Sequence, residues 1–194
     1  ENNCSVILNT SNHAPYTVDL QAENIFVDDI KIGHGIYAEK NLCDFVKKMQ
    51  TLEPESLFVI VGDHADRFNT DKNPSTYERY CVPLIIFGCG VRQDFFAENS
   101  AGSQIDILPT IFEFIAPKGF EYFSVGRSLT ENIFGVNHLL FITKNFIGNA
   151  NNFPLQAEKI FPDRNFEFNS VELEDYINFV RGVSFWRVKH GKNL

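Results

Sequence analysis

Two residues that can bind a metal ion follow directly after a short apolar segment of the chain. Leu57–Val61 consists of five apolar residues and is typical of a strand that is buried on both faces. Gly62 comes next and permits a bend that would aim the neighbouring side chains of Asp63 and His64 at one point, which an extended chain would not do. A carboxylate beside an imidazole suits Zn²⁺ or Mn²⁺ better than Ca²⁺, which prefers oxygen ligands. The same pair is also compatible with a helix-capping aspartate beside a surface histidine.

A third residue with useful chemistry lies in a polar loop near the start of the sequence. The apolar run at 4–8 predicts a strand, and His13 follows it in a loop that contains Pro15. An imidazole in such a loop could donate to an anionic oxygen or protonate a leaving group. Without its context, His13 also reads as an ordinary loop histidine.

Hydrophobic periodicity predicts the elements that must position these residues. Apolar residues recur at helical spacing over 29–50, 105–115 and 171–181, and Gly182 is expected to end the last of these helices. Short apolar runs at 57–61, 82–87 and 139–143 predict strands. Doubly buried strands that alternate with helices favour an α/β fold, namely a three-layer α/β/α sandwich around a mostly parallel or mixed central sheet. Such sheets bind ligands beyond the carboxyl ends of their strands.

The composition limits the class of protein. A chain of 194 residues and 22.2 kDa with 44% hydrophobic residues can bury a core without disulfides or a structural metal. The formal net charge is −8, and the sequence has no block of Lys or Arg, so we expect no nucleic-acid partner. No apolar run approaches the roughly 20 residues of a membrane-spanning helix.

Six short segments carry a further signal through their order and spacing. They are SNHAPY at 11–16, FVIVGDH at 58–64, VPLIIFG at 82–88, SQIDILPT at 103–110, GRSL at 126–129 and FIT at 141–143. In this order they resemble the C-terminal half of the catalytic domain of the sulfatase and alkaline-phosphatase superfamily. They are most similar to its lipoteichoic-acid-synthase-like phosphoglycerol transferase branch, and the resemblance is clearest over residues 1–150. It implies that residues 1–194 form a single domain, the C-terminal portion of a sulfatase-like catalytic domain with a partial alkaline-phosphatase-like fold.

The resemblance also assigns roles to the candidate residues. Asp63 and His64 would hold a divalent metal ion (Mn²⁺ or Zn²⁺, or Mg²⁺), and His13 would be a catalytic residue that binds the transferred group. In this superfamily the nucleophile comes from the N-terminal half, which no segment here matches. The hydroxyls of Thr10 and Thr70 lack the family's nucleophile context. We therefore expect no nucleophile in this chain and no turnover by the chain alone.

The implied reaction is the transfer of a phosphoglycerol or phosphoethanolamine group from a phospholipid-derived donor through a covalent intermediate. Two alternatives stay open, a sulfuric ester hydrolase and a non-catalytic binding module. The resemblance further implies a parent protein anchored in the membrane, with its catalytic domain in the periplasm or on the outer face of the cell membrane. The N-terminal half of the domain and the anchor would then lie outside this chain.

Three further polar residues are expected to have structural or solvent-exposed positions. Asp106 follows Ser103 at the start of a predicted helix and is expected to cap or brace that helix, and Arg127 is expected to be structural too. His34, which lies between two glycines in the first predicted helix, is expected to face solvent.

Overall fold

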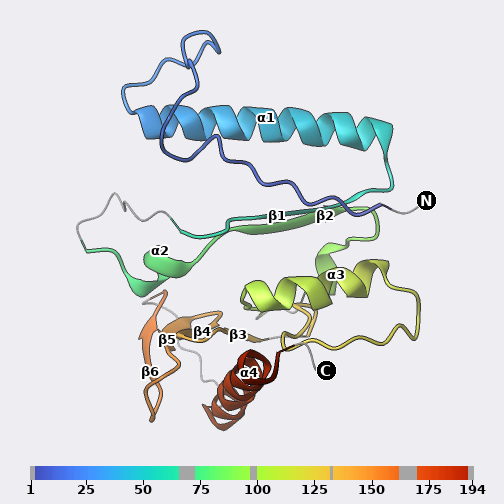
Figure 1. Cartoon of the computed structure of the whole chain (residues 1–194), viewed down its shortest axis with the longest axis vertical. Coiled ribbons are helices and arrows are strands. Elements are labelled where there is room, and N and C mark those ends of the chain that lie inside the picture. Colours follow the sequence, from blue (N-terminus) through green and yellow to red (C-terminus); the bar gives the residue numbers. More distant parts are fainter. Residues whose placement is uncertain (1–2, 66–72, 97–99, 132, 162–169, 192–194) are drawn as a thin grey trace. The chain divides into compact units, whose positions relative to one another are not determined.

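The computed structural model describes residues 3–65, 73–96, 100–131, 133–161 and 170–191, which fall into two compact units, 1–56 and 57–194 (Figure 1). The first unit contains one long helix, α1 (Ile30–Leu52), which confirms the helix predicted over 29–50. α1 begins at its N-cap Asp29, whose side chain accepts a hydrogen bond from the Lys31 N–H at 2.8 Å. The segment before the helix has no strand or helix among its described residues.

The prediction of a strand at residues 4–8 is wrong. These residues have no regular secondary structure, and the side chains of Val6 and Leu8 are 95% and 76% exposed. An apolar run becomes a strand only when a neighbouring strand pairs with its N–H and C=O groups. The described residues supply no such neighbour here.

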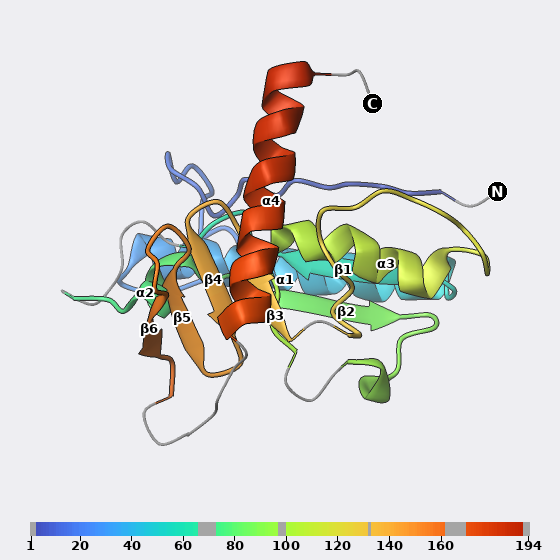
Figure 2. The ribbon, with the colours of Figure 1, turned by 90° about the horizontal axis from the view of Figure 1, so that it is seen from below.

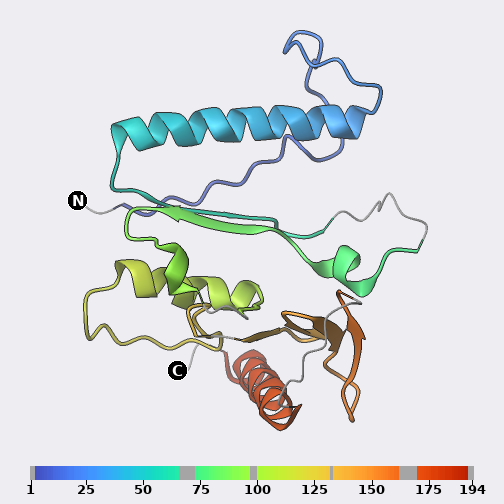
Figure 3. The same cartoon turned by 180° about the vertical axis from the view of Figure 1, so that it is seen from behind.

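The second unit opens with a two-stranded sheet. β1 (Leu57–Val61) has the bounds that its apolar run predicts, and it pairs antiparallel with β2 (Leu84–Gly88), with Val59 opposite Ile86 (Figure 3). A short helix, α2 (Thr76–Tyr80), lies between the two strands in sequence. It starts with a capping box in which Ser75 and Glu78 each bond the other's backbone N–H.

The remaining strands form a four-stranded antiparallel meander. β3 (Phe134–Val136), β4 (Leu140–Thr143), β5 (Phe146–Asn149) and β6 (Gln156–Lys159) pair in sequence order. The α/β class is confirmed. The predicted mostly parallel or mixed central sheet does not occur among the described residues, whose strand pairs are all antiparallel and form two small sheets. A continuous apolar run predicts burial on both faces, although no residue of β1 or β2 is buried here. It does not specify the direction of the neighbouring strand, which depends on where the connecting chain returns.

The core of the second unit lies between this meander and α4 (Ser170–His190). The buried cluster consists of Phe134, Val136, Phe141, Ala150, Leu173, Tyr176, Ile177 and Val180. Tyr176 donates its hydroxyl to the Val125 carbonyl at 3.0 Å, and burial raises the pKa of its phenol to about 12. The helix continues through Gly182, where the sequence predicted its end, and its C-terminal half extends past the strands (Figure 2).

The helix predicted near 105–115 is confirmed as α3 (Ile107–Ile115), which follows the 3₁₀ turn η2 (Gln104–Asp106); a second such turn, η1 (Gln93–Phe95), precedes it. Pro109 is the third residue of α3, where its missing N–H needs no partner within the helix.

Candidate functional site

β1 ends at Val61, and the chain bends at Asp63 and His64, directly after Gly62. The Gly62 N–H still donates to the Pro83 carbonyl at 3.2 Å, but the residues after it leave the strand. A Cβ at position 62 would lie 3.1 Å from the Cβ of Val82, which is tighter than most carbon contacts. A glycine therefore lets the two chains approach closely just before the side chains of Asp63 and His64.

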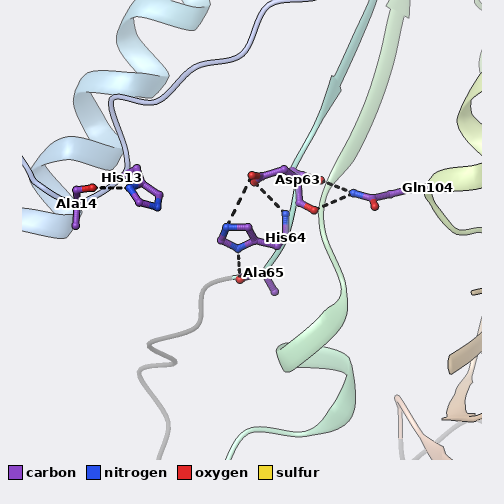
Figure 4. Close-up of polar contacts among 7 residues, drawn as sticks. His13, Ala14, Asp63, His64, Ala65 and Gln104 are labelled. Atoms are coloured by element: carbon purple, nitrogen blue, oxygen red, sulfur yellow. Dashed lines mark hydrogen bonds and ion pairs between the residues drawn. The ribbon is translucent and has the colours of Figure 1, made fainter. Parts of the chain in front are cut away.

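Hydrogen bonds fix the tautomer of the neutral His64 ring. Its Nδ1 lies 2.7 Å from the Ala65 carbonyl oxygen, which can only accept, so Nδ1 carries the proton and Nε2 keeps its lone pair (Figure 4). Nε2 lies 3.8 Å from Oδ2 of Asp63, while the other carboxylate oxygen, Oδ1, accepts from the His64 N–H at 3.0 Å. The two electron-rich atoms therefore face each other at the end of β1.

The spacing of these two atoms fits joint coordination of one metal ion. Zn²⁺ binds imidazole nitrogen and carboxylate oxygen at about 2.1 Å, so two such ligands lie at most about 4.2 Å apart. The separation of 3.8 Å falls within that limit. A histidine that binds a metal commonly donates its second ring N–H to a carbonyl oxygen, as His64 does to Ala65.

The metal site is nevertheless incomplete within the described part of the chain. No group of three or more His, Cys, Asp or Glu residues that could hold a metal ion occurs among the described residues. Catalytic zinc sites usually have three protein ligands. Asp63 and His64 are also exposed, with 74% and 47% of their side-chain surface accessible, so water competes for any ion that they hold. Asp63 and His64 thus give two candidate ligands within the described residues.

Gln104 is a residue of this site that the sequence did not reveal. Its side-chain amide donates to the backbone carbonyls of Gly62 and Asp63 at 3.1 Å and 3.0 Å (Figure 4). It thereby ties the start of η2 to the bend that carries the two candidate ligands. Only its place in the SQIDILPT segment could have drawn attention to it, and that segment was interpreted as structural.

His13 has a defined ring state in the first unit. Its backbone N–H closes a turn with the Thr10 carbonyl at 3.1 Å, and its Nδ1 lies 2.5 Å from the Ala14 carbonyl oxygen. As in His64, the carbonyl requires Nδ1 to be the donor, so Nε2 of the exposed neutral ring is free to accept a proton. Because His13 belongs to the other unit, its role in a shared site with Asp63 and His64 stays a prediction. Thr70 lies outside the described residues.

Asp106 has the structural role that the sequence predicts. Its fully buried carboxylate accepts from the N–H and hydroxyl of Ser103 at 2.7 and 3.3 Å and from the backbone N–H of Arg127 at 2.8 Å. Burial raises the pKa of this carboxyl, although the Ser103 and Arg127 contacts act in the opposite direction. The guanidinium of Arg127 stacks 3.9 Å from the ring centre of Tyr176. Asp106 and Arg127 therefore both make structural contacts within the second unit.

His34 departs from its predicted position. The structure buries the ring completely, with Nδ1 2.9 Å from the Ile30 carbonyl oxygen and Nε2 accepting from the Val18 N–H at 3.2 Å. The flanking glycines and the weak apolar periodicity at the start of α1 suggested an exposed face. They do not reveal that a preceding loop packs on this turn.

The fold of this chain is similar to part of a solved structure. The structure is similar to the crystal structure of the lipoteichoic acid synthase LtaP from Listeria monocytogenes, with a TM-score of 0.67 and 17% sequence identity. No family model and no curated protein matches the sequence. The similarity covers 95% of this chain and 52% of the LtaP chain, so the chain spans about half the length of that protein. The predicted resemblance is thus confirmed for the fold: this chain folds like about half of a lipoteichoic acid synthase.

Proposed function

We propose that this chain is part of the catalytic domain of a metal-dependent enzyme that transfers a phosphoglycerol or phosphoethanolamine group. The observation that carries the proposal is the 3.8 Å separation of His64 Nε2 and Asp63 Oδ2 at the end of β1, with the histidine tautomer set for metal binding. The likeness to half of a lipoteichoic acid synthase supports the same class of reaction. The donor would be a phospholipid-derived ester.

The residues of this chain would divide the chemistry between them. Asp63 and His64 would hold Mn²⁺, Zn²⁺ or Mg²⁺, which when bound offsets negative charge on the non-bridging oxygens of the transferred group. The Nε2 atom of His13 would hold a proton that it delivers to the departing oxygen and removes from the entering one. Gln104 would keep the backbone of Asp63 in place. The nucleophile and at least one further metal ligand would come from outside this chain.

The same proposal explains the exposed strands at 57–61 and 84–88. β1 is a run of five apolar residues, yet no residue of β1 or β2 is buried, and Ile85 is 52% exposed. An isolated two-stranded sheet is marginally stable in water. We infer that the N-terminal half of the domain adds strands to this sheet and completes a three-layer sandwich around a mixed sheet.

The parent enzyme would act outside the cytoplasm and be anchored to the membrane that contains its lipid donor. No helix among the described residues is long and apolar enough to cross a membrane. We propose that the anchor belongs to another part of the parent protein.

The test uses the full-length parent protein with Mn²⁺ and a fluorescent phosphatidylglycerol as donor. We expect release of labelled diacylglycerol, and we expect Asp63→Ala and His64→Ala to lower the rate at least about 100-fold, since even an outer partner of a metal ligand contributes about 10–100-fold. Glu121→Ala and His138→Ala are matched controls, because both side chains are exposed in the same unit. Release of sulfate from an aryl sulfate ester without any lipid turnover would instead identify a sulfatase. Absence of any metal binding would identify a binding module.

A further inference from the structure

The loop that carries His13 is attached to α1 through the buried ring of His34. Val18, five residues after His13, donates its N–H to Nε2 of His34 at 3.2 Å. The ring of Tyr16 packs against the same imidazole, with ring centres 4.9 Å apart. The other ring nitrogen, Nδ1, donates to the Ile30 carbonyl at 2.9 Å in the first turn of α1. His34 therefore joins the loop to the helix with a polar contact on each side of one ring.

Gly33 allows this close approach. A Cβ at position 33 would lie 2.4 Å from Cδ1 of Leu20 and 3.0 Å from Cγ2 of Val27, so a larger residue would push the segment away from α1. Figure 3 shows the chain before α1 running back along the helix. The apolar contacts beside Gly33 and the hydrogen bonds of His34 thus hold the same stretch of chain.

The geometry points to His34 as a positioning residue for His13, an inference that rests on the proposed function of His13. Tyr16 and Val18 are the fixed points that follow His13 in the chain, and His34 contacts both. The turn from Thr10 to His13 is exposed and is closed by one backbone hydrogen bond. Without the contact at Val18, the residues that directly follow this turn lose a backbone hydrogen bond to α1, and the direction of the His13 ring becomes variable.

The contact works in one protonation state of His34. Because the Ile30 carbonyl oxygen requires a donor at Nδ1, the neutral ring accepts the Val18 N–H at Nε2. A proton added at Nε2 places two donors opposite each other, and the hydrogen bond is lost.

The experiment compares the chain with two variants by ¹⁵N NMR. His34→Gln keeps an acceptor and a donor but does not titrate, whereas His34→Phe keeps a ring and loses both polar contacts. At pH 8 we expect the Val18 amide to exchange at least about 10-fold faster in His34→Phe than in the natural chain, since loss of a hydrogen bond of about 1.4 kcal/mol is a factor of ten. His34→Gln should restore the protection.

The order parameter of the His13 amide provides a second reading. We expect this order parameter to be lower in His34→Phe than in the natural chain and to be restored in His34→Gln. Equal protection of Val18 in all three proteins, or an unchanged order parameter at His13 in His34→Phe, would overturn the positioning role.

Inorganic phosphate separates this inference from the proposed function. We expect phosphate to shift the His13 ring signals in the natural chain and in His34→Gln, and to require at least about 10-fold more phosphate in His34→Phe. Failure of phosphate to shift His13 in the natural chain would contradict its substrate role. The exchange at Val18 and the order of His13 would still decide whether His34 positions the loop.

Discussion

The side-chain amide of Gln104 donates to the backbone carbonyl of Asp63 at 3.0 Å and so connects residues that are 41 positions apart in sequence. This contact predicts an effect on the metal site. In Gln104→Leu the backbone carbonyls of Gly62 and Asp63 lose the hydrogen bonds that the Gln104 amide donates. We expect Mn²⁺ to bind Asp63 and His64 about 10-fold more weakly in this variant. The measurement is the Mn²⁺ concentration that broadens the NMR signals of His64. Gln156→Leu, at an exposed β6 position, is the control, and equal broadening in both variants would exclude a role for Gln104.

Catalysis by the chain alone should be absent. No hydroxyl here has the family's nucleophile context, and two protein ligands hold a catalytic metal less well than the usual three. We expect no hydrolysis of p-nitrophenyl phosphate or p-nitrophenyl sulfate above buffer, with Mn²⁺ or Zn²⁺ present. Turnover by the purified chain that disappears in Asp63→Ala would contradict this expectation and would require a nucleophile within these 194 residues.

Asp106 should contribute strongly to the stability of the second unit. Its carboxylate accepts three hydrogen bonds, and an asparagine would turn one of its two acceptor atoms into a donor that faces other donors. We expect Asp106→Asn to lower the free energy of unfolding by about 1–3 kcal/mol. Urea denaturation measures the loss, with Asp94→Asn as the exposed control. Similar midpoints for the two variants would show that the network contributes little.

The contribution of Asp106 to the free energy of unfolding should change with pH in a definite direction. Burial raises the pKa of Asp106 in the folded state above its unfolded value, near 3.9, so the folded state binds its proton more tightly. The stabilisation from this shift is fully present below the unfolded pKa and is lost as the pH rises through the folded pKa. The difference in unfolding free energy between the natural chain and Asp106→Asn should therefore decrease from pH 4 upward. An increase over that range would show that the hydrogen bonds outweigh burial.

Substitutions at two glycines, Gly126 and Gly182, test the packing around the hydrogen bonds of Asp106. A Cβ on Gly126 would lie 2.0 Å from the backbone oxygen of Ile105, which cannot move without disturbing η2. We expect Gly126→Ala to destabilise the chain by at least about 1–3 kcal/mol, as overpacking does. Gly182→Ala is the matched control, because nothing lies within 4 Å of its added methyl in α4, and we expect a gain of about 0.5–1 kcal/mol. Thermal unfolding measures both, and equal shifts would contradict the packing argument.

Local patterns predicted the elements whose signal lies within one short stretch of chain. The five-residue apolar run of β1 and the amphipathic stripe of α3 were identified from their own residues. The end of β1 at Val61 could also be predicted, because a glycine follows the apolar run directly. The Asp63–His64 pair was found for the same reason, because adjacent residues need no knowledge of the fold to be placed together.

Features that depend on distant residues could not be predicted in this way. Gly182 is a helix breaker by propensity at a cost of about 1 kcal/mol, yet the buried face of α4 carries the helix through it. Residues 4–8 have the composition of a strand but no described partner, and the direction of β2 relative to β1 was decided by the connecting chain.

The amino-acid sequence alone therefore specified the α/β class, the adjacent Asp63 and His64 as candidate metal ligands, and the resemblance to the lipoteichoic-acid-synthase-like fold. The burial of His34, the amide contacts of Gln104 and the antiparallel pairing of β1 with β2 emerged only from the folded chain. Each of these depends on a contact between residues at least 16 positions apart. Such contacts form only after folding has brought distant parts of the backbone close together. The residue types of a short segment do not specify which distant group becomes its partner.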